Sequence, residues 1–495
     1  MLVIIICVER EEAVMKCTKL LPNIQNQLDN LFAVQPLIMP IVHAIEKSGG
    51  TAYLVGGAVR DLLLDAFASD IDLEVHALTL EQLEKILSTF GPVSYQGKSF
   101  GILRIHNTQL EWALPRTDSA GRKPQVTVDP QLPIEEALRR RDLTINALAI
   151  NLSTREFIDP FGGYQDLCTK TLRTPDAQFF TQDPLRFFRV MQFLARFQAL
   201  PDSQLNHVCA TMSIETISRE RIEAEFEKLF LKSKKPSLGI RWLLVINRLH
   251  EILPEVAALT SIPQEYAWHP EGTVFEHTMQ ALDAAAAQEY ASDQEKLLVM
   301  YAALCHDLGK AVTTKFIRGR IRSIGHDSAG APLARNLLKR ITRKHELLDT
   351  VPVLVKQHMA PLQFISGGSS LSAYKRLALR LAPHTTLEYL IRLAQADRQG
   401  RNYLKGHPLQ TEIHEIERFK EQAQKAGVYH GQELPVLRGS DIRDLVPPGP
   451  AMGQALKYAY EQQMRRNTQD KVVLKELVRK FLIPKKIPKK IIGKK

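Results

Sequence analysis

The sequence is poor in cysteine and has no long apolar run. Only five of its 495 residues are cysteines, and no two of them form a C-x-x-C pair. Such sparse, scattered cysteines argue against a disulfide framework and favour a reduced chain in the cytoplasm. The five are Cys7, Cys17, Cys168, Cys209 and Cys305.

The apolar start, LVIIICVER, is short, lacks a basic lead and runs at once into Glu11 and Glu12. A signal peptide needs a positively charged first part, and a membrane-spanning helix needs about 20 apolar residues. No other segment is long enough to span a bilayer. We therefore expect a cytoplasmic protein with no membrane partner.

The charge and the length of the chain indicate what kind of partner and how many domains to expect. The net charge is +11 and the isoelectric point is about 9.3, which favours a polyanionic partner but also fits a generic basic surface. A chain of 495 residues exceeds what one core usually fills, so we expect two to four domains.

The pattern along the chain predicts an α+β protein. Strand-like runs alternate with glycine turns at first, and long helical periodicities follow. The predicted parts are an N-terminal extension (1–50), a mixed α/β head (51–175), a helical neck and body (176–258), a histidine-rich helical domain (259–400), a helical C-terminal region (401–480) and a basic tail (481–495).

The head contains two aspartates one residue apart. In SDIDLEV, Ile71 and Leu73 alternate with Asp70 and Asp72, so a strand would bury one face and present both carboxylates on the other. Two such carboxylates can hold Mg²⁺ together with substrate phosphates. A solvated outer strand face is the alternative.

A glycine turn precedes this strand. Gly56 and Gly57 end an apolar run, and AVRDLLLD then begins a helix with Arg60 in its first turn. Backbone N–H groups at such a helix start, together with an arginine, suit a triphosphate. The stretch therefore combines a phosphate cradle with a metal site.

A second motif, QDPLRFFRVMQF, carries an aspartate and two arginines on one helix side. Asp183 and the proline after it are a common helix start, which is the structural alternative. Arg186 and Arg189 recur at a spacing of three. Aspartate accepts from the amine of cytosine or adenine and arginine donates to the ring nitrogen, so the pair could select these bases over uracil and guanine.

The histidine-rich domain suggests a metal site. LLVMYAALCHDLGK is an apolar helix that ends in His306 and Asp307, with Gly309 as the expected terminator. An aspartate at a helix C-terminus is electrostatically disfavoured, which points to a cation. Further ligands of a divalent metal could be His277, His326, His358 and Asp397.

Taken in order, these motifs resemble the bacterial class II CCA-adding enzymes, whose kin include bacterial poly(A) polymerases. The matching runs are LVGGAVRDLLLDAFASDID, RRRDLTINALAIN, DPFGGYQDL, QDPLRFFRVMQFLARF, RERIEAEFEKLF, WHPEGTVFEHTMQALDAA and CHDLGK. The resemblance implies a polymerase-β-like nucleotidyltransferase head followed by all-α neck, body and HD domains. The HD domain of some relatives has phosphatase and 2′,3′-cyclic phosphodiesterase activity.

The resemblance also implies roles for single residues. Mg²⁺ would be held by Asp70 and Asp72, with Glu111 as a weaker third carboxylate. Nucleotide would be contacted by Gly57, Arg60 and Arg141, and the base read by Asp183 with Arg186, while Arg189 holds phosphate or braces that pair. A second divalent metal, among Ni²⁺, Co²⁺, Mn²⁺ and Mg²⁺, would be held by His277, His306, Asp307 and Asp397.

We therefore expect the chain to add CMP and AMP from CTP and ATP to the 3′ end of tRNA. Gln182 stands where the family usually has glutamate, and residues 116–128 form a shorter segment than usual. These departures leave CC addition alone, or poly(A) synthesis, as alternatives. Two further hypotheses assign other classes of function. In one, the main activity is that of an HD phosphohydrolase, and in the other, the chain is an RNA-binding protein on a retired transferase scaffold.

Overall fold

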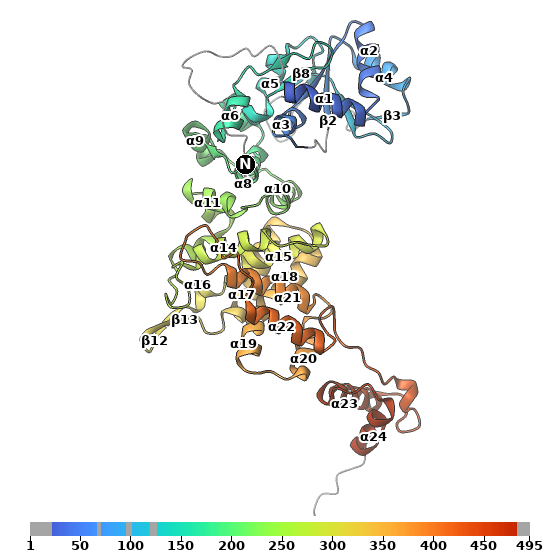
Figure 1. Cartoon of the computed structure of the whole chain (residues 1–495), viewed down its shortest axis with the longest axis vertical. Coiled ribbons are helices and arrows are strands. Elements are labelled where there is room, and N and C mark those ends of the chain that lie inside the picture. The colour runs from blue at the N-terminus through green and yellow to red at the C-terminus, as the bar shows by residue number, and fades with distance from the viewer. Residues whose placement is uncertain (1–21, 67–70, 96–100, 119–125, 483–495) are drawn as a thin grey trace, which may run out of the picture. The chain divides into compact units, whose positions relative to one another are not determined.

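The computed structural model describes residues 22–66, 71–95, 101–118 and 126–482, which fold into two compact units. The head unit runs from the first described residue to Ser233 and includes Leu238–Arg248. The helical unit comprises Lys234–Ser237 and the chain from Leu249 onward. Figure 1 colours both units along the chain and labels many of their elements.

The head unit is built on a mixed seven-stranded sheet of order β3-β4-β5-β2-β1-β8-β9. β2 and β5 run parallel, and the other neighbours run antiparallel. Since the second unit is mostly helical, the predicted α+β class is confirmed. The strands are β1 (Thr51–Val55), β2 (Ile71–His76), β3 (Val93–Tyr95), β4 (Ile102–Ile105), β5 (Leu110–Ala113), β8 (Ala149–Asn151) and β9 (Phe157–Ile158).

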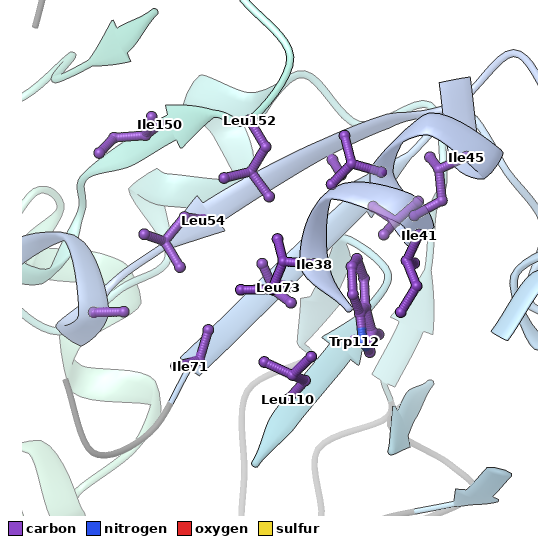
Figure 2. Close-up of a cluster of buried hydrophobic side chains, with 14 of the residues drawn as sticks. Ile38, Ile41, Ile45, Leu54, Ile71, Leu73, Leu110, Trp112, Ile150 and Leu152 are labelled. Carbon is purple, nitrogen blue, oxygen red and sulfur yellow. The ribbon is translucent and has the colours of Figure 1, made fainter. Parts of the chain in front are cut away.

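One face of this sheet carries the core. On β2, Ile71 and Leu73 are each 1% exposed and alternate with the half-buried Asp72, as a strand period of two predicts. Figure 2 shows both beside Leu110 and Trp112 of β5. The helices that pack on this face are α1 (Pro22–Val34), α2 (Ile38–Lys47), α3 (Gly57–Leu63) and α4 (Leu80–Ser88).

The predicted N-terminal extension contributes to the head unit from Pro22 on, while residues 1–21 lie outside the described part. Ile38, Ile41 and Ile45 of α2 are fully buried in the sheet core (Figure 2). Over the described ranges, no single helix has both the length and the apolar character to cross a membrane. The bent pair Ile24–Val34 and Ile38–Lys47, with 96° between its halves, meets that test jointly.

The other face of the sheet is partly covered by α5 (Ile134–Arg139), which packs on Val55 and Ala149. In the predicted short segment 116–128, β6 and β7 pair antiparallel, and residues 119–125 between them are not described. The further elements are β6 (Arg116–Asp118), β7 (Val126–Val128), η2 (Thr144–Asn146), α6 (Gly163–Thr169), β10 (Thr171–Leu172), α7 (Ala177–Gln182), α8 (Leu185–Phe197), β11 (Leu200–Pro201), α9 (Ser203–Thr211), α10 (Arg219–Lys232) and α11 (Ser237–Val245).

The helical unit packs α14, α15, α17, α18 and α21 around one another. Its elements are α12 (Leu249–Ile252), α13 (Pro254–Ala257), η3 (Ala258–Ser261), α14 (Val274–Ala286), α15 (Asp293–Cys305), α16 (Lys310–Thr313), β12 (Lys315–Ile317), β13 (Arg320–Arg322), α17 (His326–Ile341), α18 (His345–Gln357), α19 (Ala360–Ser366), α20 (Leu371–Leu381), α21 (Leu387–Gln399) and α22 (His414–Lys425).

The predicted C-terminal region ends in a small separate core. Leu437, Ile442, Met452, Leu474 and Val478 pack together there. The elements that supply them are η4 (Gly439–Ile442), α23 (Pro450–Arg466) and α24 (Lys471–Leu482). Residues 483–495, most of the predicted basic tail, lie outside the described part.

Candidate functional site

The open face of the head sheet holds a cleft of about 470 Å³. Asp72 on β2 and Glu111 on β5 lie directly opposite each other in the parallel ladder, and both line this cleft. Asp70 lies outside the described residues. Of the two aspartates predicted to share one strand face, the structure therefore places Asp72 in the cleft. The pairing of β2 with β5 puts Glu111 beside it.

Two arginines border the same cleft beside a buried carboxylate. Arg140 and Arg141 lie 3.9 and 3.8 Å from Glu74 Oε2, and His76 Nε2 lies 3.1 Å from Glu74 Oε1. Burial would raise the pKa of the Glu74 carboxyl. The hydrogen bond with His76 and the charges of the two arginines outweigh burial and lower that pKa. Glu74 thus anchors both arginines.

The glycine turn supports Arg141 more directly than it supports Arg60. Gly56 has φ +72°, and a Cβ there would lie 2.3 Å from Arg141 Nη1, so a side chain would displace this arginine. Arg60 is 4% exposed, donates to Asp61 and Asn146, and lies over two phenylalanine rings of α8. Among the described residues, the cleft lining includes neither Gly57 nor Arg60.

The predicted base-reading residues both line the cleft, but with separate partners. Asp183 accepts from Leu185 N–H at 3.1 Å, but Pro184 is the N-cap of α8, so the helix begins one residue later than predicted. Its carboxylate pairs with Arg221 of α10 at 3.0 Å. Arg186 instead donates to the carbonyl oxygens of Phe179, at 2.6 Å, and Arg140. The contacts thus orient the two side chains independently.

Arg189 lines the cleft and pairs with a buried aspartate that the sequence analysis did not assign a role. Arg189 Nε donates to Asp142 Oδ2 at 2.5 Å, and Asn146 Nδ2 donates to Oδ1 at 2.9 Å. Burial would raise the pKa of Asp142. The charge of Arg189 and these hydrogen bonds outweigh burial and lower it to about 2. Arg189 is thereby fixed beside the predicted base reader.

A second site lies in the helical unit, where all six predicted histidine and aspartate ligands meet. They come from the middle of α14, the C-terminal end of α15, the start of α17, the end of α18 and the last turns of α21. All are at most 8% exposed: His277, His306, Asp307, His326, His358 and Asp397.

These ligands form two groups that share Asp307. In the first group, His277 Nε2 lies 3.1 Å from both His306 Nε2 and Asp397 Oδ1, and Asp307 Oδ2 lies 3.3 Å from His306 Nε2. In the second group, His326 Nε2 lies 3.1 Å from His358 Nε2, and Asp307 Oδ1 lies 3.4 Å from His326 Nε2. Each group has the donor atoms that a divalent metal ion needs.

The hydrogen bonds of the rings show that these donors fit a cation. The Nδ1 atoms of His306, His326 and His358 lie 2.6–2.8 Å from backbone carbonyls and donate to them. Each Nε2 is then left as an acceptor that faces another acceptor. Burial and the neighbouring histidines lower the pKa of His358 to about 4, which keeps it a neutral ligand.

The pKa of His277 is shifted in the opposite direction from that of His358. Burial alone would lower its pKa, but hydrogen bonds with Asp397 and Glu271 outweigh it and raise the pKa to about 8. Glu271 Oε1 lies 2.9 Å from His277 Nδ1 and 2.8 Å from His269 Nδ1. A carboxylate behind a histidine orients its other nitrogen toward a metal. Sequence reasoning missed Glu271, although it stands six residues before His277 in one motif.

Two cations, also missed, balance the aspartates. Lys310 Nζ lies 2.8 Å from Asp307 Oδ2, and Arg401 Nη2 lies 3.0 Å from Asp397 Oδ1. Burial would raise the pKa of both carboxyls, but these charges and the histidines hold each pKa well below the usual range. Both aspartates are therefore ionised and able to ligate metal.

Close backbone contact brings the ligands together. A Cβ on Gly309 would lie 2.0 Å from the carbonyl oxygen of His326, so glycine allows the segment after Asp307 to touch the start of α17. Gly309 was predicted to terminate α15, but this helix ends at Cys305, and Gly309, with φ −66°, is the N-cap of α16. Its absent side chain, rather than its backbone freedom, is what this position needs.

Comparisons with known proteins match both parts of the chain. The model of the Poly A polymerase head domain matches residues 52–173, and that of the HD domain matches residues 274–398. A multifunctional CCA protein of Mannheimia succiniciproducens is 37% identical over 302 residues, which cover 58% of this chain and 69% of that protein. One from Burkholderia pseudomallei is 34% identical over 372 residues, covering 72% and 86%.

Solved structures share the fold. The Bacillus stearothermophilus CCA-adding enzyme in complex with CTP has a TM-score of 0.62 and 20% identity, covering 93% of this chain and 99% of that one. The Thermotoga maritima CCA-adding enzyme complexed with tRNA has a TM-score of 0.56 and 20% identity, covering 94% and 97%. Because one relative is 37% identical across more than two thirds of its length, and both domain models match in order, the chain belongs to the family of the multifunctional CCA proteins.

Proposed function

We propose that this chain adds C, C and A to the 3′ end of tRNA, using CTP and ATP without a nucleic-acid template. Family membership supports the activity, and one observation supports its location. Asp72 and Glu111 lie side by side on neighbouring strands in a cleft that Arg141, Arg186 and Arg189 also line. Carboxylates for a metal and guanidinium groups for phosphates thus share one open surface.

In the proposed reaction the terminal ribose hydroxyl attacks the α-phosphorus, and pyrophosphate leaves. Mg²⁺ would be held by Asp72 with Asp70, which lies outside the described residues, and by Glu111. When bound it lowers the pKa of the attacking hydroxyl and stabilises the leaving group. Arg141, held by Glu74 and the turn at Gly56, positions the phosphates. A direct contact of Gly57 and Arg60 with the triphosphate stays a prediction.

The base would be chosen by Asp183 and Arg186, supported by their positions in the same cleft. Asp183 accepts from the exocyclic amine of cytosine or adenine, and an N–H of Arg186 donates to the ring nitrogen. Uracil or guanine would meet this pair with unsatisfied groups, each costing about 1–3 kcal/mol. The carbonyls that hold Arg186 fix its plane for that contact.

Extension of a tRNA that lacks its 3′ end, resolved to single nucleotides, tests the proposal. We expect C-C with CTP alone and C-C-A, then a stop, with CTP and ATP. A stop after C-C with both nucleotides would assign CC addition only, and long A tracts would assign poly(A) synthesis. No extension under any condition would refute nucleotidyl transfer.

The buried cluster of the helical unit supports a second candidate activity, hydrolysis of phosphoesters such as a terminal phosphate or a 2′,3′-cyclic phosphate. Two groups of ligands sharing Asp307 could hold one or two divalent ions, whose chemistry is to activate water and polarise the phosphoryl group. The first group, His277, His306 and Asp397 with Asp307, is the predicted site, and His326 and His358 complete the second.

Hydrolysis of 2′,3′-cyclic AMP with Mn²⁺, Ni²⁺, Co²⁺ or Mg²⁺ tests this activity. We expect His306→Ala to abolish hydrolysis and to leave nucleotide addition unchanged. The control His414→Ala alters an exposed histidine on α22 and should change neither. Undiminished hydrolysis in His306→Ala would exclude the cluster as the hydrolytic site.

A further inference from the structure

A loop and a hairpin border the opening of the pocket beside the metal-ligand cluster. This pocket has a volume of about 240 Å³, and its lining includes Asp307 and His358 from the cluster. The loop, residues 262–273, contributes Trp268, and the hairpin β12–β13 contributes Ile321. In Figure 1 the hairpin extends away from the helices of its unit.

The hairpin has one apolar face and one cationic face. Phe316 lies opposite Ile321 in the ladder, so both share the face that reaches the pocket. The other face carries three cations and one apolar residue, with Lys315 opposite Arg322 and Arg320 opposite Ile317. These three cations are exposed. One face of the hairpin is thus apolar, and the other is mostly basic.

Aromatic side chains are exposed on the loop 262–273 and on the hairpin β12–β13, which we together call the rim. Trp268 is 66% exposed, and Tyr266 in the same loop is 71% exposed. Phe316 on the hairpin is 76% exposed. Large exposed aromatic side chains grouped beside a pocket indicate a binding surface rather than random surface composition.

The rim is held in place by backbone contacts. The turn of the hairpin has Arg318 and Gly319 at φ +51° and +76°, as in the tight turns that match the strand twist. The N–H of Ile321 donates to Glu265 Oε2 at 3.2 Å, which ties the hairpin to the loop next to Tyr266. The aromatic rings therefore stand on a preformed support.

We propose that this rim binds single-stranded RNA by its 3′ end and delivers the terminal phosphate to the pocket. Bases stack on Trp268 and Phe316, and the cations of the hairpin attract the phosphates. Aromatic faces with adjoining positive charge are the features that bind unpaired strands. This inference rests on the proposed hydrolytic function and names its substrate as an RNA end rather than a small phosphate ester.

Charge favours RNA over another copy of the chain. Lys315, Arg318, Arg320 and Arg322 place four positive charges within eight residues. Docking of this hairpin on its own counterpart would bring these charges together, whereas an RNA backbone neutralises them. A polyanion with exposed bases complements both faces of the hairpin.

Tryptophan fluorescence can test the stacking directly. Of the three tryptophans, Trp112 and Trp242 are 0% and 5% exposed, so an RNA strand can reach only Trp268 among them. We expect a single-stranded RNA octamer with a 3′-phosphate to quench this emission in the metal-free full chain. An abasic octamer with the same phosphates should not quench it, and Trp268→Phe should remove the quenching.

Binding of a labelled octamer, measured by anisotropy, gives the energetic test. Trp268→Ala should weaken binding about tenfold, and Trp268→Phe, which keeps a ring, should restore most of it. The triple variant Lys315→Ala, Arg320→Ala, Arg322→Ala should reduce the slope of log affinity against log salt by about 2. These changes avoid the turn and the metal ligands, so they should not disturb the fold.

A matched control removes the same charge elsewhere on the helical unit. Arg376, Arg418 and Lys425 are exposed on α20 and α22 and do not belong to the pocket lining. Their triple alanine variant should keep the affinity and salt slope of the parent chain. An equal loss in this control would show general attraction and overturn the proposal.

Other outcomes would also overturn it. Absent quenching by the octamer, or equal quenching by the abasic octamer, would rule out base stacking. Self-association of the chain that Trp268→Ala abolishes, without octamer binding, would assign the rim to a second copy. If quenching occurs but no divalent metal supports hydrolysis of an octamer with a 2′,3′-cyclic end, the hydrolytic function fails while the RNA-binding surface stands.

Discussion

The head cleft and the cluster of the helical unit both gather carboxylates, but they differ in burial. Asp72 and Glu111 are half-buried and line an open cleft of about 470 Å³. Asp307 and Asp397 are 2% and 3% exposed, and His277 is fully buried. The cleft therefore leaves its oxygen atoms partly hydrated, whereas the donors of the cluster are buried among the five helices that carry or adjoin them, α14, α15, α17, α18 and α21.

This difference predicts different metal behaviour. Mg²⁺ keeps several waters and binds through one or two carboxylates together with substrate phosphates, which suits the cleft. Imidazole and carboxylate donors that are already oriented suit a transition-metal ion that stays bound. Dialysis against a chelator should thus remove the head metal rapidly and the metal of the cluster slowly.

The largest effect is expected from Asp72→Asn. If Asp72 is a ligand of the metal, as proposed, its loss removes several kcal/mol of transition-state stabilisation, so nucleotide addition should fall about 1000-fold. Cyclic phosphate hydrolysis and metal content of the cluster should stay unchanged, because the cluster uses other ligands. Glu135→Gln, an exposed change on α5, is the control. Full addition by Asp72→Asn would refute the assignment of the cleft.

Glu271→Gln probes the closed site. The amide keeps the shape but loses the charge that orients His277, and loss of such a partner typically lowers metal affinity 10–100-fold. Competition with a chelating dye measures this change, and nucleotide addition should not move. Glu415→Gln, on the exposed side of α22, provides the matched control. Unchanged metal affinity would mean that His277 is oriented without Glu271.

The sequence predicted what depends on local period and on motif order. Alternation in the β2 segment placed Asp72 opposite the core, and the order of histidines and aspartates placed six ligands together. Long-range partners could not be predicted this way. The pairing of Asp183 with Arg221 joins residues 38 apart, and no spacing rule links them. Gly309 was noticed, but its close neighbour across the fold was not visible in the sequence.

The surroundings of Arg60 also depend on long-range packing that the sequence did not predict. Its place in the first turn after two glycines predicted a phosphate contact, which stays a prediction, and the structure adds contacts with Asp61 and the rings of Phe193 and Phe197. The two rings come from α8, more than 130 residues away in the chain. The sequence correctly predicted the helix α3 that carries Arg60, but it could not predict which side chains of α8 pack on this arginine.

Arg189→Met tests whether the open site relies on internal pairing for stability. Removal of the guanidinium leaves Asp142 buried without its main partner, so the free energy of unfolding should fall by about 2 kcal/mol at pH 7. The pKa of Asp142 is lowered in the folded chain, so the stabilisation is present above pH 4 and is lost as the pH falls toward 2. The parent and the variant should therefore converge in that range.

Urea unfolding at several pH values measures this difference. Arg196→Met is the control, since it removes an arginine of the same helix whose nearest carboxylate oxygen, on Asp61, is 3.9 Å away. A constant difference between parent and Arg189→Met from pH 7 to pH 3 would show that the ion pair is not its source.

The smallest effect concerns base choice, because Asp183 pairs with Arg221 and is also proposed to accept from the base. Asp183→Asn should reduce the preference for CTP over UTP about tenfold, because an unsatisfied group typically costs 1–3 kcal/mol. Arg221→Gln should change stability by less than about 1 kcal/mol, since both members of that pair are well exposed. Single-nucleotide addition with each triphosphate gives the ratio of kcat/KM, and Arg219→Gln on the same helix is the control. If Arg221→Gln alters the preference as much as Asp183→Asn does, the base is read by the Asp183–Arg221 pair, and Arg186 only shapes the cleft.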